Sequence, residues 1–234
     1  MKCIENILCS KQLLCIFIFH YVRINNIKLD HGGEKFMEYK STIKSRPYLY
    51  KETKKVASLI NQGVKVNDIK NKSLEENIFQ LESEARKREV ASIISTRLKD
   101  LDKFIIDKIS EGNVEISKIL VLYAIIKTDR LFFEFMNEVF KEKLLLRDLF
   151  LRDKDFNTFF QSKREQSEKV ASWTEYTFKK LKQVYIRILF ECGLIENQKG
   201  DRRIKTPILE REVMEYLYKI GDKIYINAII GDGE

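Results

Sequence analysis

The side chains whose types and spacing suggest a chemical role in this 234-residue sequence lie between Trp173 and Thr206. A predicted helix begins at Trp173, and one of its faces is basic and polar along the first half. The residues of that face are Tyr176, Lys179, Lys180 and Gln183, with Arg187 one turn later. Cationic side chains contact phosphate groups, whereas hydroxyl and amide groups can also reach base or sugar edges. The predicted chemistry is therefore binding to a polyanion.

The elements around this face resemble a known arrangement for such binding. Ser172 and Glu175 have the spacing of a capping box, and an apolar stripe at 3-4-3-4 spacing predicts the buried side of the helix. That stripe consists of Phe178, Leu181, Tyr185, Ile188 and Cys192. The stretch "CGLIENQKGDRRIKTP" (192–207) then predicts a helix end, a short strand, a glycine-containing turn and a short basic strand.

A helix–turn–helix followed by a small basic hairpin is the plan of a winged helix, in which one helix enters the major groove of DNA. Arg202, Arg203 and Lys205 supply the charge of the predicted wing. Tyr176, Thr177 and Gln183 are the predicted contacts to bases or sugars. An alternative stays open at this point, because a solvated basic face beside a plain surface hairpin would give the same spacing.

A second helical block precedes this one. The sequence predicts a helix over 51–63 that stops at Gly63, a capping box at Ser73 and Glu76, and a helix over 83–101. The last of these opens with Arg86, Lys87 and Arg88 and turns apolar from Val90, which suits a recognition helix. An ordinary exposed first turn is the alternative, since Glu84 and Glu89 dilute the positive charge.

The remaining pattern is also helical. Helices are expected over 102–111 and 152–166, and 113–150 predicts two core helices broken near Thr128-Asp129. The sequence thus predicts an all-α, compact multi-helix globule with two helix-turn-helix or winged-helix-like elements and a small C-terminal β-hairpin wing. We expect an N-terminal helix-turn-helix region (37–111), central core helices (112–150) and a C-terminal winged-helix-like region (151–234). Charges throughout argue against a membrane span, so a cytoplasmic protein is predicted.

The sequence from Met37 onward lacks the catalytic and metal-binding residues that several enzyme classes need. Both histidines, His20 and His31, precede Met37, and Cys192 is the single cysteine after it. Residues 37–234 therefore cannot form a histidine-based nucleophile system, a histidine-ligated zinc site or a cysteine pair. The glycines form neither phosphate-binding pattern, GxxxxGK[ST] or GxGxxG, and "DKD" (153–155) is interpreted as a solvated helix start. No catalytic residue, metal or cofactor is predicted.

Residues 1–36 differ from the rest of the sequence. They carry Cys3, Cys9, Cys15 and both histidines, and their apolar run "LLCIFIF" (13–19) is too short to span a membrane. The codons for Gly32-Gly33-Glu34 can contain a purine-rich ribosome-binding site at a suitable distance before Met37. We hypothesise that translation starts at Met37. The alternative is a genuine disordered or amphipathic N-terminal extension.

Three stretches carry a resemblance to a known family. They are "SRPYLYKETKKVASLINQG" (45–63), "ENIFQLESEARKREVASIISTRL" (76–98) and "WTEYTFKKLKQVYIRILFECGLIE" (173–196). Their order and spacing, from about Tyr39 to Ile230, resemble BrxA, a small core component of BREX bacteriophage-exclusion systems. The resemblance implies an all-helical monomer with two helix-turn-helix elements that binds double-stranded DNA, without known catalytic residues.

The function predicted from the sequence is that of a non-enzymatic, double-stranded DNA-binding component of a phage-defence system. The net charge of +8 fits an anionic partner. The main alternative is a protein-interaction adaptor that docks a methyltransferase or an ATPase of the same system. A transcriptional regulator is a third possibility, although it would normally dimerise on paired half-sites and the sequence offers no obvious dimerisation helix.

Overall fold

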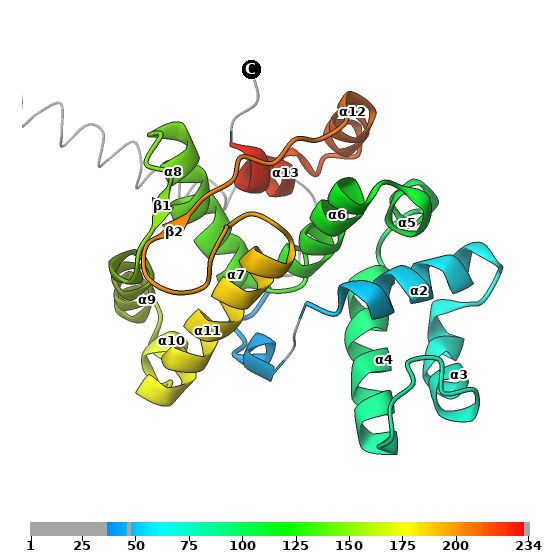
Figure 1. The fold of residues 1–234 in the computed structure, drawn as a ribbon. Coiled ribbons are helices and arrows are strands. Elements are labelled where there is room, and N and C mark those ends of the chain that lie inside the picture. Colours follow the sequence, from blue (N-terminus) through cyan, green and yellow to red (C-terminus); the bar gives the residue numbers. More distant parts are fainter. Residues whose placement is uncertain (1–36, 46–47, 232–234) are drawn as a thin grey trace, which may run out of the picture. The chain divides into compact units, whose positions relative to one another are not determined.

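The computed structural model describes residues 37–45 and 48–231, and its elements carry the labels of Figure 1. The expectations for residues 1–36 fall outside this part of the chain. Within it the structure is mostly helical, with one small two-stranded sheet. The prediction of an all-α class with a small β element near the C-terminus is confirmed at this level. None of the described helices has the length and apolar character needed to cross a membrane.

The N-terminal elements form a helical group around α2. In chain order they are η2 (Thr42–Ser45), α2 (Tyr50–Asn61), η3 (Val66–Asp68), α3 (Ile69–Glu75), α4 (Glu84–Leu98) and α5 (Lys103–Glu111). Helix α2 packs against α4 and α5, and α3 packs against α4. The helix predicted over 51–63 is therefore present, and Gly63, with a φ of 94°, follows its end. Positive φ is costly for other residues, so glycine suits this stop.

The central helices carry most of the core. Helix α6 (Val114–Ile126) is buried along every residue from Ile119 to Ile126. The predicted break is confirmed, because the carboxylate of Asp129 accepts the backbone N–H of Phe132 and starts a new helix. That helix consists of α7 (Arg130–Phe135), the π-helical segment η4 (Met136–Phe140) and α8 (Lys141–Leu145).

The C-terminal elements include a very small sheet. They are β1 (Phe150–Leu151), α9 (Asp153–Gln166), α10 (Glu168–Ala171), α11 (Glu175–Glu191), β2 (Arg202–Arg203), α12 (Arg211–Lys219) and α13 (Lys223–Ile230). Strand β2 is antiparallel to β1, with Phe150 opposite Arg203. On its other side Ile204 forms an isolated bridge with Ile195. Helix α13 packs on α6, η4 and α8.

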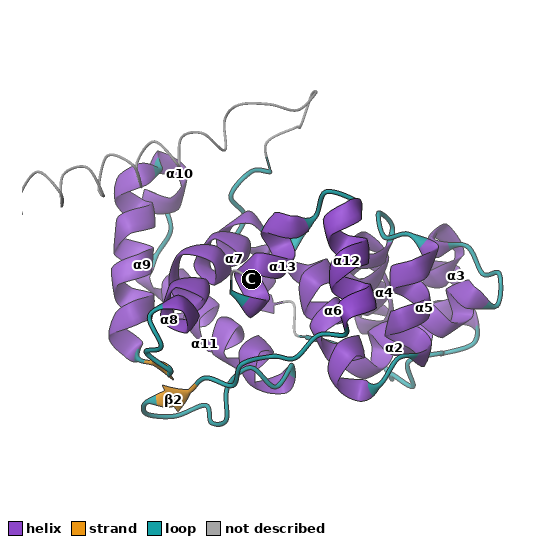
Figure 2. Ribbon diagram, turned by 90° about the horizontal axis from the view of Figure 1, so that it is seen from above, coloured by secondary structure: helices purple, strands orange, loops and turns teal. Residues whose placement is uncertain are grey.

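The two segments of the predicted hairpin meet at a single isolated bridge, and the main partner of β2 was missed. The N–H of Glu196 donates to the carbonyl of Arg203 at 3.0 Å, and the N–H of Lys205 donates to the carbonyl of Leu194 at 2.9 Å. The longer ladder, however, joins β2 to β1, where the sequence predicted only helix up to residue 150. Figure 2 shows β2 as a short strand beside a long loop.

Both predicted capping boxes were wrong. Ser73 lies inside α3, where it is buried and its hydroxyl donates to the carbonyl of Lys87. Helix α11 starts at Glu175, two residues after the predicted Trp173, and Thr174 caps it by accepting the N–H of Thr177. Ser172 instead ends α10. Several neighbouring Ser and Thr residues fit the same capping pattern, so tertiary packing decides which one caps.

Candidate nucleic-acid interface

The buried side of α11 fixes which of its residues face outward. Leu181, Tyr185, Ile188 and Leu189 are fully buried on this helix. The ring of Tyr185 lies 4.5 Å from that of Phe132 and 5.3 Å from that of Phe135, between ring centroids. Burial of such aromatic rings contributes several kcal/mol and gives the helix one stable rotation about its axis. The residues of the opposite face therefore point to solvent.

The outward face carries the polar and basic residues that the sequence predicted. Tyr176 is 64% exposed, and Lys179 and Gln183 are exposed. The ammonium group of Lys180 lies 5.5 Å above the ring of Tyr176, a cation–π contact that leaves its charge available. Neither Lys179 nor Lys180 pairs with a carboxylate among the described residues. The first half of α11 thus presents uncompensated positive charge.

Two neighbouring residues behave differently from this group. Arg187 is exposed, but its Nε lies 2.6 Å from Oε1 of Glu191, one turn further along. Such an exposed pair contributes about 0.5 kcal/mol, so a phosphate group can replace the carboxylate at little cost. Thr177 is only 7% exposed and its Oγ1 lies 3.2 Å from Oγ1 of Thr174. The Thr177 side chain is therefore part of the helix cap, and its predicted DNA contact is not available in this structure.

The wing residues divide in the same way. Arg202 is 5% exposed, and its guanidinium group donates to the carbonyl oxygens of Gln198 and Leu151. It also forms an ion pair with Asp153. The predicted phosphate contact of Arg202 is thus replaced by a structural role, because strand alternation turns this side chain inward and its neighbour outward. Arg203 and Lys205 are exposed.

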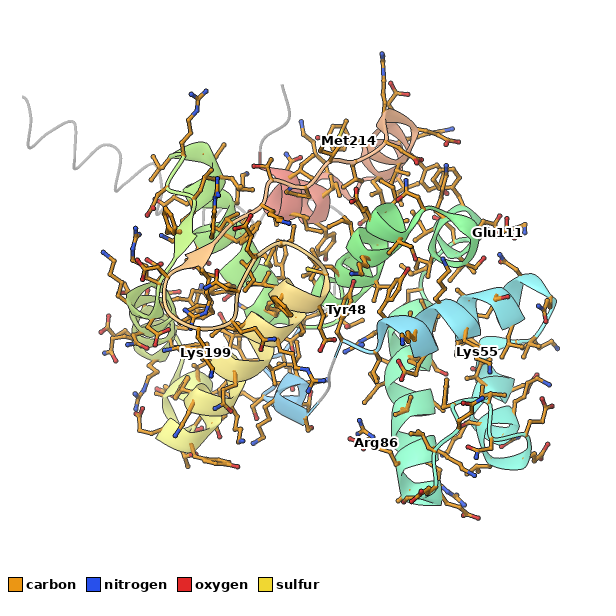
Figure 3. All side chains as sticks on the ribbon, in the orientation of Figure 1. Tyr48, Lys55, Arg86, Glu111, Lys199 and Met214 are labelled. Atoms are coloured by element: carbon orange, nitrogen blue, oxygen red, sulfur yellow. The ribbon has the colours of Figure 1, made fainter. Side chains whose placement is uncertain are left out.

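The sequence analysis missed a cation at the tip of the wing. Lys199 is exposed in the loop between Ile195 and β2, next to Gly200, which has a φ of 67°. Figure 3 labels Lys199 on this loop, which lies beside α11 in Figures 1 and 2. The signal was present, since Lys199 sits in the predicted turn of the basic hairpin. The candidate surface, called the α11–wing surface below, comprises Tyr176, Lys179, Lys180, Gln183, Arg187, Lys199, Arg203 and Lys205.

The cluster at the start of α4 is compensated by its own carboxylates. Arg86 pairs with Glu89 at 2.6 Å, and Arg88 pairs with Glu84 at 3.2 Å. Lys87 is half-buried, and Figure 3 labels Arg86 on the first turns of α4. The pattern of an exposed polar start followed by a buried half from Val90 is present. The charge of this cluster is nevertheless weaker than that of the α11–wing surface.

A single carboxylate joins α11 to the wing. Asp153, the first residue of α9, lies 2.8 Å from Nζ of Lys182 on α11 and 2.9 Å from Nη2 of Arg202 on β2. The hydrogen bond from Lys182, followed by that from Arg202, lowers the pKa of Asp153. An aspartate is ionised at neutral pH in any case, and the two cations extend its ionised range to lower pH. The interpretation of "DKD" as a helix start is confirmed, with this added tertiary role.

Cys192 ends α11 in the core. Burial raises the pKa of its thiol to about 12. The thiol is thus protonated at neutral pH, and protonated thiols are poor nucleophiles. In the described part of the chain, no group of three or more His, Cys, Asp and Glu residues is placed to hold a metal ion.

Comparison with known proteins places this fold in a family. The family model of BrxA matches residues 37–221. A BREX protein BrxA from Bacillus cereus (strain H3081.97) is 57% identical over 194 residues, which cover 83% of this chain and 97% of that protein. A BREX protein BrxA from Paramagnetospirillum magneticum (strain ATCC 700264 / AMB-1) is 24% identical over 82% of this chain and 96% of its own length.

A solved structure shares the fold. It is the crystal structure of an uncharacterized protein from Magnetospirillum magneticum, with a TM-score of 0.70 and 24% identity. The match covers 82% of this chain and 98% of the other. The resemblance that the three sequence stretches indicated is confirmed by the family model and by the 57% identical relative. This chain belongs to the BrxA family.

Proposed function

We propose that this chain is a non-catalytic component of a BREX bacteriophage-exclusion system that binds double-stranded DNA as a monomer. Membership of the BrxA family supports the assignment to such a system. The observation that carries the DNA-binding part is the uncompensated positive charge of Lys179 and Lys180 on the outward face of α11, beside the exposed cations of the wing.

The connectivity supports a winged-helix interpretation of this region. The chain runs from β1 through α9, α10 and α11 to the bridge at Ile195, and then through a loop to β2, which pairs back onto β1. In a winged helix the last of these helices enters the major groove and the wing contacts the backbone. We assign these roles to helix α11 and to the loop that carries Lys199.

The roles of the residues follow from their chemistry. Lys179, Lys180, Arg187, Lys199, Arg203 and Lys205 would contact phosphate groups, and Tyr176 and Gln183 would contact sugars or base edges. Most of these groups are cations that position a protein on the backbone without reading the base sequence. The proposed binding is therefore largely independent of DNA sequence and sensitive to salt. Arg86, Lys87 and Arg88 would make a secondary contact, because carboxylates already pair with the two arginines.

The test is fluorescence anisotropy of the full chain with a labelled duplex at several salt concentrations. Lys179→Glu combined with Lys180→Glu should lower the affinity at least about tenfold at low salt, since two attractions become repulsions. The matched control is Lys219→Glu with Lys223→Glu, which makes the same change in charge at exposed positions of α12 and α13. Equal effects of the two variants, or no binding by the wild-type chain, would contradict the proposal.

The rival function is that of a protein-interaction adaptor. In that case the same cations would meet an acidic surface of another component, such as a methyltransferase or an ATPase. Copurification of the chain with the other components of its system distinguishes the two functions. Loss of DNA binding with retained assembly in the Lys179→Glu/Lys180→Glu variant supports the DNA-binding function, and the reverse result supports the adaptor.

A further inference from the structure

A second basic surface lies on α2, outside the elements that the proposed DNA interface uses. It is a solvent-open groove of about 480 Å³. The residues that line it are Tyr50, Lys51, Lys54, Lys55, Ser58, Leu59, Gln62 and Ser110. Figure 3 labels Lys55 on α2, which is separated in the picture from Lys199 on the wing. We call this surface the α2 groove.

The lysines of the α2 groove are not compensated. Lys51, Lys54 and Lys55 form no ion pair with a carboxylate among residues 37–45 and 48–231, whereas Lys72 and Lys103 on nearby helices each pair with one. Lys118 of α6 adds a fourth positive charge, because its ammonium group lies 5.9 Å from the ring centroid of Tyr50. Charges of one sign that line a concave surface focus the electrostatic potential and attract an anionic group.

Two of the residues that line the groove supply apolar surface. Leu59 and Tyr50 are half-buried and pack against the hydrophobic core. The ring of Tyr50 is stacked on that of Tyr48, with centroids 6.1 Å apart and an interplanar angle of 11°. With Tyr48 and Lys118 both against this ring, it is not a free platform for a nucleic-acid base. Leu59 offers apolar contact area. An aliphatic side chain of a ligand would gain from burying this area, whereas a phosphate backbone would not.

The polar end of the groove completes its chemistry. Ser58, Gln62 and Ser110 supply hydroxyl and amide groups, and Asn61 donates a hydrogen bond of 2.8 Å to the hydroxyl of Ser110. A site lined by apolar groups, several lysines and a few hydrogen-bonding groups matches an extended or helical peptide that carries carboxylates around an apolar residue. DNA readers, in contrast, insert a protruding helix or strand pair into a groove of the duplex.

We propose that the α2 groove is a docking site for an acidic segment of a protein partner, with an apolar side chain over Leu59 and carboxylates against Lys51, Lys54 and Lys55. This goes beyond the proposed DNA binding, which uses α11 and the wing, with a secondary contact at the start of α4. Because the two surfaces lie on different helices, the chain could hold DNA and an acidic protein segment together.

The experiment selects binders from a random library of roughly 12-residue peptides displayed on yeast, with the full chain as bait. Selected peptides should be enriched in sequences with several Asp or Glu residues flanking a Leu, Ile or Phe. In anisotropy titrations of an enriched, labelled peptide, Lys51→Glu with Lys55→Glu should weaken binding at least about tenfold. The charge-matched control Lys219→Glu/Lys223→Glu should change it by less than about twofold.

Three results would overturn the docking site. The first is a selection without acidic enrichment, and the second is an equal loss of peptide binding in the groove variant and in the control. The third is a loss of duplex binding in Lys51→Glu/Lys55→Glu as large as that in Lys179→Glu/Lys180→Glu, which would make the groove part of the DNA surface. Failure of the proposed DNA binding is measured separately, because it appears with the duplex and not with the peptide.

Discussion

Asp153 Oδ1 lies 2.9 Å from Nη2 of Arg202, a contact that joins the first turn of α9 to a strand almost fifty residues later. The other carboxylate oxygen of Asp153 lies 2.8 Å from Nζ of Lys182 on α11. Because both cations belong to the region of the α11–wing surface, this carboxylate fixes the position of the wing relative to the helix. It also holds two positive charges away from the surface, so they do not contribute to proposed phosphate contacts.

Replacing Asp153 by Asn should loosen the wing and destabilise the fold slightly. We expect a loss of about 1 kcal/mol at neutral pH, because Asp153 is mostly exposed and exposed ion pairs contribute little. Its folded-state pKa is lowered, so its contribution is complete above the unfolded value and disappears as the pH falls through the folded value. In urea unfolding, the free energies of unfolding of the wild type and Asp153→Asn should become equal at acidic pH. A constant difference down to about pH 2 would contradict this cause.

Truncation of the two adjacent arginines of β2 should affect different properties, the stability for Arg202 and the DNA affinity for Arg203. Arg202→Ala removes a buried guanidinium group with its ion pair and two carbonyl contacts, and should cost about 2 kcal/mol of stability. Arg203→Ala removes an exposed group and should change stability by less than about 0.5 kcal/mol. DNA affinity should fall for Arg203→Ala. Thermal unfolding and anisotropy together check this, and similar stabilities of the two variants would count against the burial argument.

The wing should contribute to the salt dependence of DNA binding. If Arg203 and Lys205 each neutralise one phosphate, the double variant Arg203→Ala/Lys205→Ala should reduce the slope of log K against log salt by about 1.8. Lys219→Ala/Lys223→Ala serves as the control and should leave the slope unchanged. The measurement is anisotropy of a labelled duplex over a range of salt concentrations. An unchanged slope in the wing variant would show that the wing does not touch the backbone.

Tyr185 offers a test of the core beneath α11. Its hydroxyl is buried, and no partner for this oxygen exists among the described residues. An unsatisfied buried hydroxyl costs about 1 to 3 kcal/mol, so Tyr185→Phe should leave the free energy of unfolding unchanged or raise it by about 1 kcal/mol. The ring of Phe135 contacts that of Tyr185, so Phe135→Ala should lower the free energy of unfolding by about 3 to 5 kcal/mol. Clear destabilisation by Tyr185→Phe would reveal a hydrogen bond at this oxygen.

The helices were predictable because their signals are local. Gly63 ends α2, Asp129 restarts the chain after α6, and the apolar stripe through Tyr185 set the buried side of α11. Periodicity also placed Lys179 and Gln183 outward, since a helix with one buried side exposes the opposite side. The capping residues failed for a related reason. Ser73 fits a cap pattern in sequence, but its hydroxyl bonds to Lys87 on the next helix.

The sequence predicted the short basic strand that forms β2, but its pairing with β1 and the roles of individual cations were not predictable. A two-residue strand has no periodicity to detect, so β1 became visible only through its pairing with β2. Arg202 and Arg203 are adjacent residues of the same type, yet Arg202 is buried against Asp153 and Arg203 is exposed. The α2 groove depends on Ser110 of α5 lying beside Lys51 of α2, a contact that no local pattern contains.

The sequence by itself determined the helical class, the outward basic face of α11 and the resemblance to the BrxA family. These properties follow from hydrophobic periodicity and from the order of whole segments, which are encoded along the chain. The tertiary structure alone decided that Arg202 and Lys182 are held by Asp153, whereas Arg203 is exposed. The pairs Arg86–Glu89 and Arg187–Glu191 follow from helical spacing, but Asp153 reaches Arg202 and Lys182 only because packing brings α9 beside α11 and β2.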